Sequence, residues 1–204
     1  MPDKVEGKAS WENHAKDNGL KIGVSARKTL WGLSMGRRQK PLLAVFRSAL
    51  PTAGIACSLL ALVTGNPEPW RIGFVASFVS KLADTVSSEI GKAYGTKTYL
   101  ATSFKQVPRG TEGAVSLEGT GAGVLSAVGL SAMGYILRQV SLMDTIWVVI
   151  AATVANYLES VLGASLQGSE EVPWLTNDVV NGLQISVAAL IALGLHSWGY
   201  ILYF

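Results

Sequence analysis

Residues 145–165 read TIWVVIAATVANYLESVLGAS, and this stretch decides the fold class. It carries a single formal charge, at Glu159, among runs of valine, isoleucine, alanine and leucine. An α-helix needs about 20 consecutive, mostly apolar residues to cross the hydrocarbon core of a bilayer. The stretch therefore predicts one transmembrane helix, and its polar positions need a reason to lie at membrane depth.

Four further apolar stretches indicate that the chain crosses the membrane several times. They cover residues 42–64, 70–83, 120–140 and 181–204. We expect an all-α fold over residues 41–204, a polytopic membrane helix bundle of about five transmembrane helices. In the last stretch, Trp198, Tyr200 and Tyr203 suit the aromatic belt found at a membrane interface.

The composition excludes several other classes of protein. Of the 204 residues, 49% are hydrophobic and only 15% are charged, whereas soluble domains carry about 25% charged residues. The mean hydropathy is +0.33. So much apolar surface excludes a disordered chain, and it excludes a soluble nucleic-acid binder despite an isoelectric point near 9.0. Cys57 is the single cysteine, so the sequence holds no internal disulfide and no CxxC metal site.

The charges are unevenly distributed along the chain. Residues 1–47 hold ten lysines and arginines against four aspartates and glutamates. Residues 1–40 are a basic polar N-terminal arm, which the positive-inside rule keeps on the inner side of the membrane. Alternating helices then place two polar loops, residues 84–119 and 166–180, on that same side. This arrangement suits an enzyme that takes a charged co-substrate from the inner aqueous phase.

The first polar motif spans residues 84–95. On a helix, Asp84, Ser87, Ser88, Gly91 and Gly95 share one face because they recur at spacings of three and four. Small residues let a phosphate chain approach closely, and Mg²⁺ is usually bound by one or two carboxylates plus phosphate oxygens. The alternative is a helix end whose carboxylates simply face water.

The second motif spans residues 105–120 and is rich in glycine. Glycines can bend the backbone so that its N–H groups face an anion, and the Arg109 guanidinium can fork onto phosphate. The alternative is a solvated loop that re-enters the membrane, with Thr120 capping the next helix. Gly119, Gly121 and Gly123 fit close helix packing better than a dinucleotide fingerprint, because no strand is expected before them.

The third motif is a stripe of small and polar residues on one helix face: Asn156, Glu159, Ser160, Gly163, Ala164 and Gln167. Ionisable groups at membrane depth are costly, and they normally face a bundle interior or an aqueous cavity. Asn177 or Asp178 then caps the last helix. The alternative is interhelical hydrogen bonding without a ligand. His14 and His196 have no partner pattern.

Together the three motifs predict a metal and phosphate site on the inner face. The residues assigned to catalysis are Asp84, Glu89, Arg109 and Glu159. The residues assigned to substrate and phosphate binding are Lys81, Ser87, Ser88, Gly91, Lys105, Gly110, Thr111, Gly113, Asn156, Asn177 and Asn181. The residues assigned to Mg²⁺ are Asp84, Glu159 and Asp178.

Four segments carry a resemblance to a known membrane family. They are SKLADTVSSEIGKAYG at residues 80–95, VPRGTEGAVSLEGT at 107–120, NYLES at 156–160 and NDVVN at 177–181. Over roughly residues 70–195 the chain resembles the family that contains plant and cyanobacterial phytyl-phosphate kinase and animal transmembrane protein 19. The first two segments resemble the photosynthetic branch most. Family members carry further hydrophobic helices before this region, so the chain is expected to be N-terminally shortened relative to them.

The resemblance implies a function and a location. The photosynthetic branch phosphorylates phytyl phosphate to phytyl diphosphate with a nucleoside triphosphate, and so feeds tocopherol and prenylquinone synthesis from chlorophyll-derived phytol. The resemblance implies an isoprenoid phosphate substrate, a nucleoside triphosphate co-substrate and membrane lipid as partners. The carboxylates add Mg²⁺ as the expected cofactor, the composition excludes nucleic acid, and a homo-oligomer is possible. The implied cellular location is the chloroplast envelope or a cyanobacterial membrane, with the N-terminus and the active side of the protein facing the stroma or the cytoplasm.

Other functions fit the same motifs. One is a polyprenol or phytol kinase, and another is a lipid nucleotidyltransferase, because an aspartate among small residues serves either chemistry. A third is a membrane carrier for an isoprenoid or an anionic solute. Carriers are often built from inverted repeats with polar sites near the midplane, and no convincing repeat is visible in this sequence.

Overall fold

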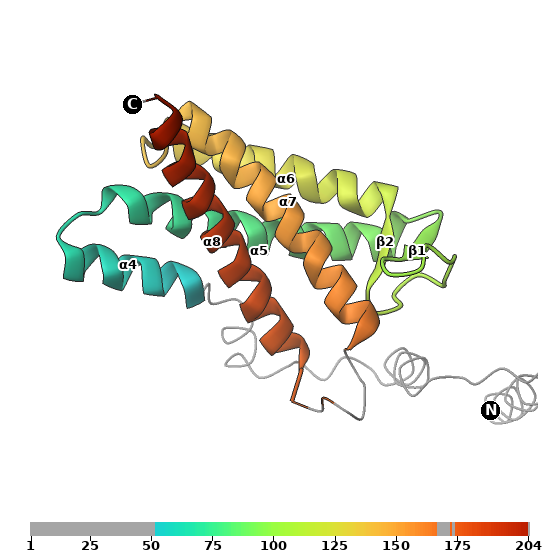
Figure 1. Cartoon of the computed structure of the whole chain (residues 1–204). Helices are drawn as coiled ribbons and strands as arrows, with labels where there is room; N and C mark the ends of the chain where they lie inside the picture. The colour runs from blue at the N-terminus through green and yellow to red at the C-terminus, as the bar shows by residue number, and fades with distance from the viewer. Residues whose placement is uncertain (1–51, 167–171, 173, 204) are drawn as a thin grey trace, which may run out of the picture. The chain divides into compact units, whose positions relative to one another are not determined.

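The computed structural model describes residues 52–166, 172 and 174–203, which form five helices and one small sheet (Figure 1). The helices are α4 (Thr52–Thr64), α5 (Glu68–Tyr94), α6 (Leu117–Ile136), α7 (Leu142–Ser165) and α8 (Asn177–Tyr203). The sheet pairs β1 (Thr98–Leu100) with β2 (Ala114–Ser116). The prediction of a helical membrane bundle is confirmed. The N-terminal arm and Gln167 lie outside the described residues.

Three of these helices are long and apolar enough to cross a membrane: α6, α7 and α8 through Gly199. Helix α4 is apolar but only 13 residues long. Helix α5 has 27 residues and carries six charged side chains. It contacts each of the other four helices. The most polar helix is therefore the central one, and its neighbours cover much of its surface.

Helix α5 continues well past the end of its apolar stretch. The sequence predicted a polar loop from residue 84, but the helix runs to Tyr94 and the loop begins at Gly95. Two ion pairs at i,i+3 support the added turns, Lys81 with Asp84 and Glu89 with Lys92. The second loop is also shorter than predicted, because α8 already begins at Asn177.

The two short strands were not predicted. Tyr99 pairs with Val115 in an antiparallel ladder, and Tyr99 also bridges Gln106. The Tyr157 hydroxyl of α7 donates to the Ala101 carbonyl oxygen over 3.3 Å and ties the hairpin to the bundle. A strand thus precedes the glycines of α6, but it belongs to a hairpin and not to a βαβ unit.

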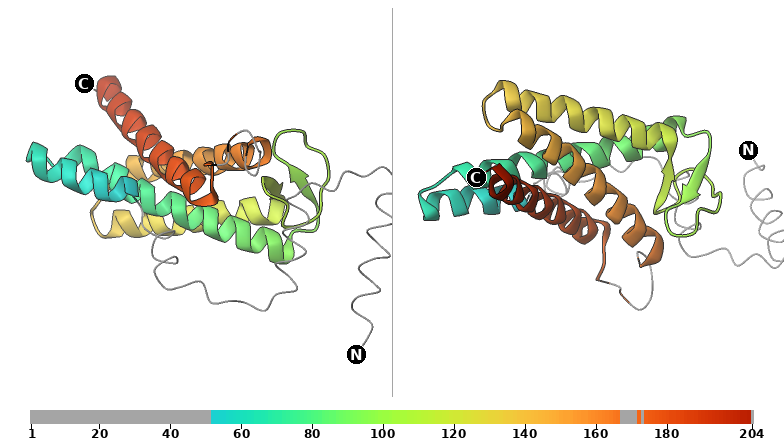
Figure 2. Two further views of the ribbon diagram at one scale, coloured as in Figure 1. Left: turned by 90° about the horizontal axis from the view of Figure 1, so that it is seen from below. Right: turned by 45° about the horizontal axis from the view of Figure 1, so that its top comes forward.

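The hairpin marks one end of the bundle, which we call the hairpin end. Helices α5 and α7 run toward it and α6 runs away from it, as the views in Figures 1 and 2 agree. The α4–α5 turn and the α6–α7 connection, residues 137–141, lie at the opposite end. The loop after α5 and the loop after α7 therefore start at the same end of the bundle.

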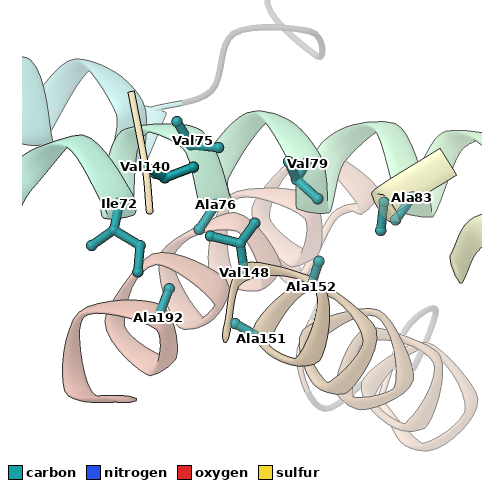
Figure 3. Close-up of a cluster of buried hydrophobic side chains, with 11 residues drawn as sticks. Ile72, Val75, Ala76, Val79, Ala83, Val140, Val148, Ala151, Ala152 and Ala192 are labelled. Carbon is teal, nitrogen blue, oxygen red and sulfur yellow. The ribbon is translucent and has the colours of Figure 1, made fainter. Parts of the chain in front are cut away.

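Small residues let the helices approach closely. The core cluster joins α5, α6, α7 and α8, and alanine is its most frequent residue (Figure 3). A Cβ atom on Gly119 would lie 2.6 Å from the Ser87 carbonyl oxygen, and one on Gly123 would lie 3.0 Å from the Ala83 carbonyl oxygen. The packing role predicted for these two glycines is confirmed. Gly121 faces open space instead.

Candidate functional site

The centre of α5 holds a largely buried ion pair. The Lys81 ammonium donates to Asp84 Oδ2 over 3.0 Å, and the two side chains are 20% and 12% exposed. Both residues are on the same helix face, one turn apart. A carboxylate removed from water needs such a partner, because an unpaired buried charge is strongly destabilising.

Glu159 of α7 completes a group of three charges with this pair. It is partly buried, and the charges of Asp84 and Lys81 both act on it. We call Lys81, Asp84 and Glu159 the carboxylate cluster. The sequence predicted that α5 and α7 would bring Asp84 and Glu159 to one site, and the structure places them within electrostatic reach of each other.

Helix α8 supplies a residue that the sequence reasoning missed. Gln184 is 3% exposed, and its Nε2 donates to Ser80 Oγ over 2.9 Å and to the Ser80 carbonyl oxygen over 3.2 Å. Its Oε1 is buried and has no hydrogen-bond partner among the residues that the structure describes. Asn181, one turn before Gln184, is also buried. The available signal was the spacing of Asn177, Asn181 and Gln184 at i, i+4 and i+7.

A cavity of about 330 Å³ lies between α5, α6, α7 and β2, and its lining includes Ala83 and Ser160, the sequence neighbours of Asp84 and Glu159, but none of the three cluster residues. Asn156 and Ser160 of α7 line it, on either side of Glu159 in the sequence, and Ser87 lines it from α5. Most of its other lining residues are apolar, among them Val124 and Val154. The cavity therefore offers an apolar space bordered by a few polar groups.

The three carboxylates predicted for Mg²⁺ do not form a common site. Within the described segments, no group of three His, Cys, Asp or Glu side chains could hold a metal ion. Asp178 is exposed in the first turn of α8, and Asp84 is engaged by Lys81. Asp84 and Glu159 remain as a pair, and Mg²⁺ needs only one or two carboxylates when phosphate oxygens supply the other ligands.

Three predicted residues of α5 do not join the cluster. Glu89 is five residues after Asp84, which places it about 140° further around the helix axis. It is therefore on another face, where it is 70% exposed and pairs with Lys92 over 3.3 Å. Gly91 packs against the start of α6, where Ser116 Oγ would lie 3.3 Å from an added Cβ. Ser88 donates to the Thr85 carbonyl oxygen of its own helix. The face predicted to admit phosphate is therefore partly covered by α6.

The residues predicted on the glycine-rich loop lie at the hairpin end. Arg109 Nη1 donates to the Ala93 carbonyl oxygen over 3.2 Å. Ala93 is nine residues beyond Asp84, which is about 14 Å along the helix axis. Lys105 is exposed, and its carbonyl oxygen accepts from Leu100 N. Arg109 and Lys105 are thus not contacts of the carboxylate cluster.

The remaining loop residues shape the backbone. Thr111 donates from its hydroxyl to the Pro108 carbonyl oxygen over 2.7 Å. Gly110 and Gly113 have positive φ, +81° and +70°. Gly113 also packs on the end of α7, because an added Cβ would lie 2.2 Å from Ala164 N. Glycine at this position therefore allows the close approach of the loop to α7.

The helix caps differ from those predicted. Ser116, not Thr120, caps α6 by accepting from Gly119 N over 3.1 Å. Thr176 precedes α8 and accepts from Val179 N at its hydroxyl oxygen, whereas Asn177 is the first helical residue. Each cap lies one to four residues before the predicted one.

Comparison with known proteins identifies the family. Residues 23–189 match the model of a family described as integral membrane protein DUF92. The chain belongs to this family. The resemblance drawn from the four segments is thereby confirmed at the level of the family, and the carboxylate cluster lies inside the matched region. No solved structure matches the chain.

Three relatives come from distant organisms. The chloroplastic protein VTE6 of Arabidopsis thaliana is 49% identical over 145 residues, which cover 69% of this chain and 44% of VTE6. An uncharacterized membrane protein of Synechocystis is 48% identical over 157 residues, covering 75% and 58%. One of Methanocaldococcus jannaschii is 33% identical over 126 residues, covering 60% and 50%. The chain therefore spans about half the length of these relatives.

Proposed function

We propose that the chain is an integral membrane phosphotransferase that converts phytyl phosphate to phytyl diphosphate with a nucleoside triphosphate. The observation that carries the proposal is the carboxylate cluster, a largely buried Lys–Asp pair within electrostatic reach of a second carboxylate inside a helical membrane bundle. Ionisable groups in such a place are costly and are kept for function. Phosphoryl transfer depends mainly on positioning and charge stabilisation, which carboxylates and a lysine can supply without a dedicated nucleophile.

The residues of the cluster take different roles in this proposal. Asp84 and Glu159 would be the carboxylate ligands of Mg²⁺, and substrate phosphate oxygens would supply further ligands. The bound metal would neutralise charge on the transferring phosphoryl group. The Lys81 ammonium group, which pairs with Asp84 in this structure, would neutralise negative charge on a substrate phosphate.

The 330 Å³ cavity suits the isoprenoid end of the substrate. Its apolar lining would contact hydrocarbon, and Asn156 and Ser160 border it on the helix face that carries Glu159. An isoprenyl phosphate has the same division, an apolar chain that ends in a charged group. This agreement favours an amphiphilic substrate over a wholly polar one.

The relatives support a location for this activity. One is named as chloroplastic and another comes from a cyanobacterium. We place the protein in a chloroplast envelope or cyanobacterial membrane, with the hairpin end and the N-terminus facing stroma or cytoplasm. There it would supply phytyl diphosphate for tocopherol and prenylquinone synthesis.

The test is a product assay with the purified chain in detergent. Phytyl phosphate, Mg²⁺ and each nucleoside triphosphate are supplied in turn, and the products are identified by mass. Phytyl diphosphate that disappears when the metal is chelated supports the proposal and identifies the nucleotide. Phosphorylation of phytol alone would indicate a polyprenol-type kinase, and a nucleotide-linked lipid a nucleotidyltransferase. Uptake of phytyl phosphate into liposomes without any product would indicate a carrier.

A further inference from the structure

A second and larger cavity lies at the opposite end of the bundle. It measures about 630 Å³ and is bounded by the start of α5, the α6–α7 connection, the start of α7 and the end of α8. Sites for small ligands usually measure about 300–1,000 Å³. This cavity shares no lining residue with the 330 Å³ cavity and includes none of the carboxylate cluster, and it lies at the other end of the bundle, so it is distinct from the site proposed for phosphoryl transfer.

The depth of this cavity in the membrane follows from the two helices that flank it. Helix α6 ends at Ile136 and helix α7 begins at Leu142, and both are long and apolar enough to cross a membrane. The five residues between them must therefore lie at a membrane–water boundary, where lipid headgroups are found. Tyr135 and Trp147 line the cavity, and such amphipathic rings are typical of that depth.

The charges that line the cavity favour an anion. Arg138 forms no ion pair within the part of the chain that the structure describes, and Arg71 has only a long contact of 3.9 Å with Glu68. The Asp144 carboxylate is already engaged: Oδ2 accepts from Ser141 N and Oγ, and Oδ1 lies 2.6 Å from His196 Nδ1. The guanidinium groups of Arg71 and Arg138 thus share the cavity with two carboxylates, of which Glu68 is exposed and Asp144 already has hydrogen-bond partners.

The backbone of Arg138 adds an independent observation. Its φ is +55°, the left-handed conformation that usually selects glycine after a helix. Arg138 N donates to the Tyr135 carbonyl oxygen and Gln139 N to that of Gly134, as in such a helix end. A side chain costs about 1–2 kcal/mol in this conformation. An arginine held where glycine would be less strained indicates that its side chain has a function.

We propose that this cavity binds the phosphate group of an anionic membrane lipid, with Arg138 as the principal contact and Arg71 as the second. A guanidinium offers two parallel donors that match phosphate oxygens. Tyr135 and Trp147 contact the glycerol and upper acyl region. The Asp144–His196 pair joins α7 to α8 and fixes the wall of the cavity, with both side chains less than one-fifth exposed. This site is independent of the proposed phosphotransferase activity.

The test measures lipid binding to the full chain by native mass spectrometry in detergent. The probes are phosphatidylglycerol, phosphatidylcholine and water-soluble glycerol phosphate. We expect phosphatidylglycerol to bind preferentially and Arg138→Gln to weaken it about tenfold, in line with the loss of a charged hydrogen bond. Arg138→Lys should bind with intermediate strength. Lys97→Gln, which removes an exposed charge at the hairpin end, should bind as the unsubstituted chain does.

Arg138→Gly separates binding from folding. Glycine relieves the positive φ, so this variant should melt at a higher temperature while binding phosphatidylglycerol as poorly as Arg138→Gln. Equal phosphatidylglycerol binding by Arg138→Gly and the unsubstituted chain would overturn the proposal. Tighter binding of glycerol phosphate than of the lipid would overturn the assignment to a lipid.

Discussion

The close contact of α5 and α6 makes a quantitative prediction about two neighbouring glycines. In Gly119→Ala the new Cβ would lie 2.6 Å from the Ser87 carbonyl oxygen and 3.0 Å from Gly91 Cα. Both are backbone atoms of α5, which cannot rotate away as the end of a flexible side chain could. The helices must then separate locally by roughly 1 Å, because interiors are close-packed. In Gly121→Ala the new Cβ meets nothing within 4 Å.

The two substitutions should change stability in opposite directions. Overpacking costs about 1–3 kcal/mol, while alanine in place of glycine in a helix gains up to about 1 kcal/mol. Gly119→Ala should therefore lower the free energy of unfolding by about 1–2 kcal/mol, and Gly121→Ala should raise it by about 0.5–1 kcal/mol. A change of 1 kcal/mol shifts Tm by about 2–4 °C at this chain length, so the two variants should differ by about 5–10 °C.

The chain carries its own reporter for this measurement. Cys57 is the single cysteine and is 5% exposed, so a fluorogenic maleimide labels it only as the protein unfolds. Thermal unfolding of both variants and the unsubstituted chain can be followed in one detergent. Gly119→Ala melting at or above Gly121→Ala would refute the packing of α5 against α6.

Two further variants can be measured in the same way. Gly113→Ala should melt well below Gly110→Ala. Both positions have positive φ, but only Gly113 lies against α7, where an added Cβ comes within 2.2 Å of Ala164 N. Equal melting temperatures of the two variants would contradict that contact. Ser141→Ala should lower stability by about 1 kcal/mol, because it removes the capping box with Asp144 at the start of α7. An unchanged Tm would mean that this cap is not formed.

The helices could be predicted because each membrane-spanning helix consists of a continuous run of mostly apolar residues, which is visible in the local sequence. The apolar run at residues 145–165 gave α7 to within three residues at its start. The glycines at positions 119 and 123 likewise predicted a close contact, since small residues at a spacing of four have few other uses in a bundle. What these patterns could not supply was the partner, which proved to be Ser87 and its neighbours on α5.

The other features of the fold and the site could not be predicted, because they depend on contacts between residues far apart in the sequence or on ion pairs between neighbouring charges. The polar residues from Asp84 onward predicted a loop, although α5 continues to Tyr94 and the Glu89–Lys92 pair lies within it. Gln184 contacts Ser80, 104 residues away in the sequence, and His196 contacts Asp144, 52 residues away. A helical period predicts which face of a helix is polar, but it does not predict which residue of another helix that face contacts. The prediction that Asp84 and Glu159 share a site rested only on the chemistry of their carboxylates.

Whether Asp84 takes part in phosphoryl transfer can be measured in one matched pair of variants. Asp84→Asn and Glu89→Gln change two carboxylates of the same helix, the first buried in the carboxylate cluster and the second 70% exposed. With both variants shown to be folded by the Cys57 assay, turnover of phytyl phosphate to phytyl diphosphate is measured by mass. We expect a loss of at least about a hundredfold for Asp84→Asn and unchanged turnover for Glu89→Gln. Equal turnover by the two variants would contradict this expectation.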